Sequence, residues 1–266
     1  MNEPAAAGNT VSLQNVIKNY GDHPAVRDVS LDLRAGEVFA FLGQNGAGKT
    51  TTLKLTCGLL QPDAGRVSVC GFDMSREAEA GKRLIAYVPD TPFLYDKLTG
   101  REFIQFTVDV YGIPARISKP RISEIVNRLD MTGFLDELAE TYSHGMKQRV
   151  ALAAALVHSP RLLVVDEPLV GLDPRTIRIA KTIFREIAES GGTVFMSTHT
   201  LDVAEQVADR IGILHAGRIV ALGTLSELKR QAALDGRLED VFLRITSDAP
   251  RVDAQANGDA RQEEAA

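Results

Sequence analysis

The chain has 266 residues and a mass of 28.8 kDa, enough for one sizeable hydrophobic core with a smaller subsidiary lobe. Its formal net charge of −5 gives no electrostatic basis for general nucleic-acid binding, so no nucleic-acid partner is expected. The same charge does not suggest a polybasic membrane anchor. No run approaches the roughly 18 consecutive apolar residues of a membrane span, and the first residues lack the pattern of a signal peptide. If the protein serves a membrane, we expect it to do so from the aqueous side.

Both ends of the chain are poor in apolar residues. We expect residues 1–10 and 246–266 to be disordered tails around a folded domain of residues 11–245. Cys57 and Cys70 have neither a metal-binding spacing nor a disulfide pattern, and we expect both to be reduced and buried.

The first elements of the domain read as short strands and one helix. The predicted strands cover residues 11–17, 26–33, 37–42, 66–71 and 84–89. A helix is predicted over residues 49–60, ended by the turn sequence QPDAG. The early strands have the pattern of an antiparallel arrangement.

The second half of the chain changes character twice. Residues 99–157 follow a helical pattern, with breaks near YGIPARISKP and ETYS, and we expect them to form an inserted helical lobe. Strands and helices then alternate, and HAGR predicts a tight hairpin between the last two strands. Alternation of this kind predicts an α/β fold with a mainly parallel sheet. The expected architecture is a phosphate-loop NTPase core with an N-terminal antiparallel β lobe and a helical lobe.

The sequence FLGQNGAGKTT lies between a predicted strand and a predicted helix. Its spacing, G-x-x-x-x-G-K-[ST], is typical of a loop whose backbone N–H groups surround phosphates. Lys49 is expected to reach the β- and γ-phosphates, and Thr50 to ligate Mg²⁺. The sequence therefore predicts that the protein binds a nucleoside triphosphate with Mg²⁺. The predicted binding residues are Gly43, Gln44, Asn45, Gly46, Ala47, Gly48, Lys49, Thr50 and Thr51.

Two carboxylates end the apolar strand RLLVVDEP. In phosphate-loop proteins an acid at this place helps to hold Mg²⁺, which predicts that role for Asp166. Glu167 would then point toward the γ-phosphate and act as the base for the attacking water. The alternative, a solvated acid pair at a strand end, is common when no phosphate loop is present.

His199 follows another apolar strand, in VFMSTHT. If that strand runs beside the strand of Asp166, His199 can contact the γ-phosphate and hold Glu167 or the water in line. The alternative is an ordinary surface or capping histidine. A second anion site is indicated at Ser143 and Gly145, where a long helix is expected to begin.

Taken in order, GQNGAGKT, YSHGMKQR, LLVVDEP, GLDP and STH resemble the nucleotide-binding subunit of an ATP-binding cassette (ABC) transporter. The resemblance covers about residues 11–223. It implies an ATPase that acts with a separate polytopic membrane permease at the cytoplasmic face of the membrane. YSHGMKQR and LEDVFLRIT resemble the export-type branch.

The resemblance also implies a second ATPase subunit, identical or different, bound head to tail. Ser143 and Gly145 would contact the γ-phosphate of the ATP held by that partner, and Asp173 would lie at the dimer contact. Tyr20 matches an aromatic residue that stacks on adenine, with an edge-strand tyrosine as the alternative.

The sequence departs from the family pattern at two positions. His144 stands where a glycine is usual in the signature stretch, residues 142–149, and Asp90 stands where a glutamine is usual. A carboxylate at Asp90 is a candidate Mg²⁺ ligand. Phe93, Leu94 and Tyr95 follow a loop stiffened by proline. They could form a docking surface for the permease, or could simply pack within the helical lobe.

Two other classes of protein remain as alternatives. A soluble ABC-type ATPase acting on ribosomes or DNA would usually carry two cassettes or a long coiled coil, and the sequence shows neither. An unrelated phosphate-loop kinase or GTPase is disfavoured because no guanine-selecting N-K-x-D motif is present.

Overall fold

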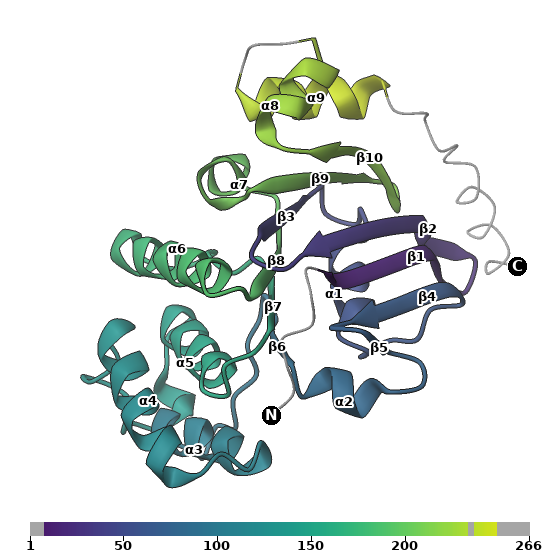
Figure 1. The fold of residues 1–266 in the computed structure, drawn as a ribbon. Helices are drawn as coiled ribbons and strands as arrows, with labels where there is room; N and C mark the ends of the chain where they lie inside the picture. The colour runs from purple at the N-terminus through teal and green to yellow at the C-terminus, as the bar shows by residue number, and fades with distance from the viewer. Residues whose placement is uncertain (1–7, 234–236, 249–266) are drawn as a thin grey trace, which may run out of the picture.

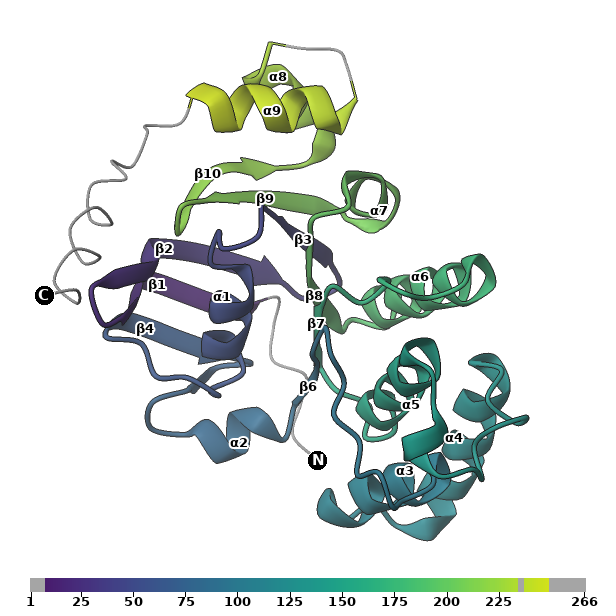
Figure 2. The same cartoon turned by 180° about the vertical axis from the view of Figure 1, so that it is seen from behind.

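The structure, a computed structural model, describes residues 8–233 and 237–248. These residues form two sheets with helices around them, in the orders β2-β1-β4-β5 and β10-β9-β3-β8-β7-β6. Figures 1 and 2 show the smaller sheet beside one face of the larger sheet, and helices α3 to α5 grouped together near the β6 edge, with α5 packed against β6. The predicted α/β fold with two lobes is confirmed.

The smaller sheet is antiparallel, as predicted for the early strands. Its strands are β1 (Asn9–Tyr20), β2 (His23–Arg34), β4 (Ala64–Val69) and β5 (Phe72–Asp73). β1 and β2 form a long hairpin in which Tyr20 faces His23 across the turn. Valine and leucine side chains on one face of this hairpin are buried, while the other face is exposed.

The larger sheet is parallel except for its last strand, β10, which returns antiparallel to β9. Its strands are β3 (Val38–Leu42), β6 (Ile85–Val88), β7 (Leu162–Asp166), β8 (Thr193–Thr198), β9 (Arg210–His215) and β10 (Arg218–Gly223). The predicted β9–β10 hairpin has Ala216 and Gly217 at its turn, both with positive φ, as a tight two-residue turn requires.

The central strands are buried on both faces, which explains why they read as continuous apolar runs. Phe39, Phe41 and Phe195 point to one face, where helix α1 (Lys49–Thr56) lies between the two sheets. Alternate residues, such as Ala40 and Met196, point to the opposite face and meet the other helices. The phosphate-loop helix is therefore held inside the core.

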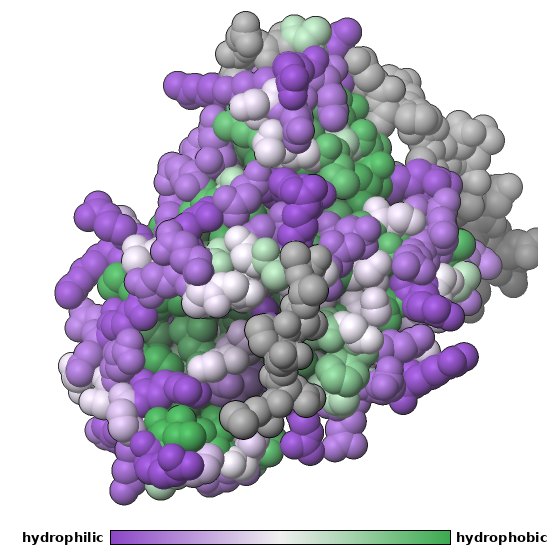
Figure 3. Space-filling model, viewed as in Figure 1, coloured by the Kyte–Doolittle hydropathy of each residue, from purple (hydrophilic) through white to green (hydrophobic). Residues whose placement is uncertain are grey.

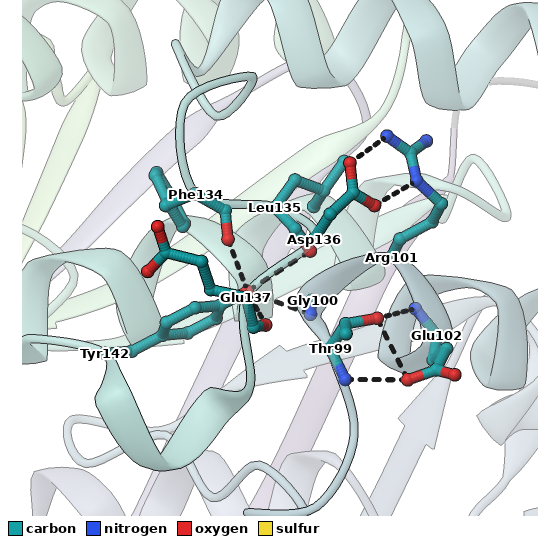
Figure 4. Close-up of polar contacts among 9 residues, drawn as sticks. All are labelled: Thr99, Gly100, Arg101, Glu102, Phe134, Leu135, Asp136, Glu137 and Tyr142. Carbon is teal, nitrogen blue, oxygen red and sulfur yellow. Dashed lines mark hydrogen bonds and ion pairs between the residues drawn. The ribbon is translucent and has the colours of Figure 1, made fainter.

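The predicted helical lobe consists of α3 (Gly100–Val110), α4 (Ala115–Arg128) and α5 (His144–Leu156), with the short 3₁₀ turn η1 (Ala139–Thr141) before α5. Thr99 and Glu102 form a reciprocal cap at the start of α3, and Arg101 pairs with Asp136 (Figure 4). The break predicted before α4 is shorter than expected, because α4 begins at Ala115 and includes Pro120.

The remaining helices are α2 (Ala78–Lys82), α6 (Pro174–Glu189), α7 (Leu201–Val207), α8 (Leu225–Gln231) and α9 (Leu238–Asp248). α6 and α7 are helices of the alternating strand–helix pattern that the sequence predicts for this half of the chain. Within residues 8–233 and 237–248, no helix is long and apolar enough to cross a membrane.

Some predicted boundaries differ from the structure. β1 begins at Asn9 and α9 extends to Asp248, so residues 9–10 and 246–248 are structured rather than part of tails. The other residues of both predicted tails lie outside the described residues. Helix α1 ends at Thr56 instead of near residue 60, because Gly58 adopts a left-handed conformation that ends the helix.

Candidate functional site

The carboxyl ends of four parallel strands meet at one edge of the larger sheet. β3 leads into the phosphate loop, β7 ends at Asp166, β8 leads to His199, and β6 leads to Asp90. β8 pairs with both β3 and β7, so the strand of His199 does run beside the strand of Asp166, as predicted. Parallel pairing therefore brings together side chains that are far apart in the sequence.

The phosphate loop depends on glycine at Gly48. Its φ of 103° lies in the left-handed region, and a Cβ atom there would lie 2.3 Å from the carbonyl oxygen of Ala25. Gly43 is equally constrained, since its Cβ would lie 2.5 Å from the carbonyl oxygen of Leu214. The loop thus lies directly against the neighbouring backbone, and its residues 44–51 line an open pocket.

Lys49 lies at the base of this loop and is 6% exposed. Its Nζ donates hydrogen bonds to the carbonyl oxygens of Gly43 at 2.7 Å and Gln44 at 3.3 Å. The same nitrogen lies 3.7 Å from Oε1 of Glu167. The ammonium group is therefore held within the pocket by protein acceptors, which phosphate oxygens could replace.

Asp166 is buried at the end of β7, with 1% of its surface exposed. The hydroxyl of Thr50 donates to Oδ2 at 2.7 Å, and the hydroxyl of Ser197 donates to Oδ1. Carboxylate and hydroxyl oxygens are the ligands that Mg²⁺ prefers, so Thr50 and Asp166 fit such an ion. No cluster of three His, Cys, Asp or Glu in the described part of the chain could hold a metal alone. Phosphate and water would supply the other ligands.

Glu167 points to the same edge, with 15% of its side chain exposed. Nδ1 of His199 lies 3.0 Å from Oε1, and the backbone N–H of His199 donates to Oε2 at 3.3 Å. The backbone of Glu167 has a φ of 48°, a conformation that costs a non-glycine residue on the order of 1–3 kcal/mol. Backbone strain of this kind, at a residue whose carboxylate is held by His199 just after β8, is typical of a functional site.

A pocket of about 330 Å³ lies between the phosphate loop and the β1–β2 hairpin. The residues that line it are Tyr20, His23, Ala25, Gln44, Asn45, Gly46, Ala47, Gly48, Lys49, Thr50, Thr51, Asp90, Asp166 and Glu167. Tyr20 is half-exposed at the mouth, and Asp90 accepts a hydrogen bond from the N–H of Thr91 at 2.7 Å. The pocket also includes His23 and Ala25, which belong to no recognisable sequence motif.

Ser143, Gly145 and Asp173, all described residues, are not among those lining this pocket. Ser143 caps α5 by accepting a hydrogen bond from the N–H of Met146 at 3.3 Å. Asp173 caps α6, and its hydrogen bonds from the Thr176 hydroxyl, the Thr176 N–H and the Arg175 N–H hold its pKa below the usual value. The two caps are neighbours, because Gly145 approaches the carbonyl oxygen of Gly171.

Tyr142 fixes the start of the signature stretch within the helical lobe. Its buried hydroxyl accepts a hydrogen bond from the N–H of Gly100 at 2.9 Å. As Figure 4 shows, the hydroxyl also faces the carbonyl oxygens of Phe134, Leu135 and Glu137, at 2.9–3.2 Å. The residue directly before Ser143 is thus anchored to two other segments.

The two cysteines lie apart from these groups as free thiols, Cys57 buried and Cys70 partly buried. Burial raises the pKa of each thiol, which keeps both protonated at neutral pH. The prediction of unbridged cysteines is confirmed for the described structure, whereas burial is confirmed for Cys57 only. Neither thiol has the character of a nucleophile.

The family model described as ABC transporter matches residues 26–170. Relatives include the linearmycin resistance ATP-binding protein LnrL of Bacillus subtilis (strain 168), 37% identical over 81% of this chain and 69% of LnrL. The ABC-type transporter ATP-binding protein EcsA of the same organism is 34% identical over 90% of this chain and 97% of EcsA. The chain belongs to the ABC transporter family, as an ATP-binding subunit with ATPase activity.

Solved structures agree with this assignment. An ATP-binding subunit of an ABC transporter superposes with a TM-score of 0.85 and 32% identity, covering 89% of this chain and 99% of that one. A dimeric ATP-binding cassette bound to ADP and Pi superposes with a TM-score of 0.73 and 26% identity, covering 81% and 98%. The resemblance stated from the motifs is therefore confirmed.

Proposed function

We propose that the pocket between the phosphate loop and the β1–β2 hairpin binds ATP with Mg²⁺ and hydrolyses it. The observation that carries this proposal is the convergence of Lys49, Glu167 and the Thr50–Asp166 pair on one pocket. Backbone N–H groups of residues 43–51 and Lys49 bind the phosphates. The ring of Tyr20, half-exposed at the mouth, stacks on the adenine.

In this proposal Thr50 and Asp166 hold Mg²⁺, with Asp90 facing the same space. The ion, when bound, offsets negative charge on the phosphates. Glu167 takes the proton of the attacking water, and His199 holds the Glu167 carboxylate through its ring and its backbone N–H. The catalytic residues are Glu167 and His199.

We further propose that two ATPase subunits close head to tail over the nucleotides. Ser143 and Gly145 lie at the N-terminus of α5 but outside the pocket of their own chain, so they can serve a nucleotide held by a partner. Asp173, beside them at the start of α6, would lie at the same contact. A second helix N-terminus would supply donors to the open side of the terminal phosphate and exclude water.

The work of hydrolysis is proposed to drive a separate polytopic permease at the cytoplasmic face of the membrane. An aromatic surface of the helical lobe supports a docking role: Phe93 is 77% exposed, and Phe93, Tyr95 and Phe106 stack edge to face. Figure 3 shows hydrophobic side chains reaching the surface at the lower left, over this lobe. Export is favoured because relatives such as LnrL are named for drug resistance.

A Glu167→Gln variant tests the catalytic assignment. It should bind ATP as the wild type does, lose at least roughly 100-fold in turnover because the base is missing, and accumulate as an ATP-bound dimer in gel filtration. Turnover close to that of the wild type would show that Glu167 is not the base. Ribosome co-sedimentation of the wild type, without a membrane protein co-purifying, would instead favour a soluble ABC-type ATPase.

A further inference from the structure

Ser197, near the end of β8, contacts both acids of the site. The residue is fully buried, and its hydroxyl donates a hydrogen bond to Oδ1 of Asp166. The N–H of Glu167 donates to the carbonyl oxygen of Ser197 at 3.1 Å and also lies 3.3 Å from its hydroxyl oxygen. One serine is thus bonded to the side chain of one acid and to the backbone of the next.

We propose that Ser197 is a positioning residue for ATP hydrolysis. It holds the carboxylate of Asp166 and the backbone of Glu167 in the orientations that their proposed roles require. This inference rests on the proposed roles of those two acids. Asp166 receives side-chain donors on both oxygens, from Thr50 and Ser197. If the Thr50 hydroxyl were to bind Mg²⁺, the Ser197 hydroxyl would still hold the other oxygen of Asp166 and fix the plane of its carboxylate.

The same contacts fix the direction of Glu167. The backbone of Glu167 lies in the left-handed region, a conformation that persists only where the surrounding structure holds it. Ser197 restrains the N–H, while His199 restrains the carboxylate at 3.0 and 3.3 Å. A base must be placed to within about an ångström of the water that it activates, so loosening one of these restraints affects turnover more than binding.

The test compares two buried hydroxyls on the same strand. Thr193, at the other end of β8, is also fully buried; its hydroxyl donates to the carbonyl oxygen of Arg34 at 2.9 Å and lies 2.8 Å from Thr10 Oγ1. Ser197→Ala and Thr193→Val each remove one such hydroxyl, so both should lower the melting temperature. We expect kcat to fall roughly tenfold or more in Ser197→Ala only, with the KM for ATP unchanged within about twofold.

Conservative variants complete the series. Ser197→Thr retains a hydroxyl and should restore most of kcat, whereas Ser197→Cys, with its weaker donor, should give an intermediate kcat even if Ser197→Ala folds poorly. Wild-type kcat in Ser197→Ala or Ser197→Cys, or an equal loss in Thr193→Val, would overturn the inference. Glu167→Gln in the same assay separates the two proposals: if it is inactive while Ser197→Ala is fully active, only the role of Ser197 falls.

Discussion

The nucleotide pocket and the start of the signature stretch differ in how their polar groups are satisfied. In the pocket, Lys49 donates to two carbonyl oxygens and lies near Glu167, so these groups hold each other where a ligand would sit. At the signature stretch, Tyr142 and Ser143 are bound within the helical lobe itself. If the pocket binds ATP as proposed, Lys49 must exchange these partners for phosphate oxygens, whereas the start of the signature stretch is held by contacts within its own lobe. In the proposed dimer, one chain would thus supply an adaptable half-site and a rigid half-site.

Removing Lys49 should break the pocket while leaving the signature stretch intact. Lys49→Ala should weaken ATP binding by roughly 100-fold or more, about 3 kcal/mol, because charge-assisted hydrogen bonds to phosphate are lost. Isothermal calorimetry measures the effect. Lys54→Ala, on the same helix but not lining the pocket, should bind ATP normally. Unchanged affinity in Lys49→Ala would contradict the assignment of the phosphate loop.

Removing His199 should impair the chemistry of the pocket without affecting its affinity. His199→Ala should reduce turnover by roughly 10- to 100-fold, because Glu167 loses its ring contact, while ATP affinity stays close to that of the wild type. Steady-state phosphate release gives both parameters. His215→Ala is a matched control, since His215 also ends a strand of this sheet but lies at the β9–β10 turn, opposite Arg218. Full activity in His199→Ala would show that His199 does not position Glu167.

Removing the hydroxyl of Tyr142 should affect the rigid half-site alone. Tyr142→Phe leaves the buried N–H of Gly100 without its acceptor, which should cost about 1–3 kcal/mol in the free energy of unfolding. Urea denaturation measures this loss. ATP affinity of the isolated chain should not change, but ATP-dependent dimerisation should weaken. The exposed Tyr95→Phe serves as the control, and a loss of ATP affinity in Tyr142→Phe would show that the two half-sites are not independent.

The smallest effect is expected at Asp173, the cap of α6. Asp173→Ala should destabilise the fold by about 1 kcal/mol at neutral pH. Because the folded-state pKa is lowered from its usual 3.8, the stabilisation is complete above that value and is lost as the pH falls through the folded-state pKa. The difference between Asp173→Ala and wild type should therefore shrink below about pH 4, where thermal unfolding can follow it. Asp173→Asn keeps a cap that does not titrate, so its difference in stability from the wild type should change with pH. If the stability differences among the wild type, Asp173→Ala and Asp173→Asn did not change with pH, this account would be refuted.

Local patterns in the sequence were sufficient to predict the pocket. The spacing around Lys49 defines a phosphate loop by itself, and apolar strands that end in Asp166 or precede His199 place those residues at one sheet edge, because parallel strands share their direction. The antiparallel lobe, the helical insertion and the family were also predicted correctly. The bounds of α1 and of the structured ends were not, since helix termini and short strands depend on packing against distant residues.

Other features were decided by the tertiary structure. Ser197 lies inside the predicted sequence VFMSTHT, yet only the pairing of β8 with β7 places its hydroxyl on Asp166. The hydroxyl of Tyr142 contacts residues 134–137 nearby in the sequence and also Gly100, which is 42 residues away. By contrast, the capping role of Asp173 could have been predicted from the sequence, because an acidic residue before a proline often begins a helix. The sequence alone was enough to propose residues 43–51 as a phosphate-binding loop, because those residues are contiguous. How each group is held depends on contacts across the sheet, which no local pattern encodes.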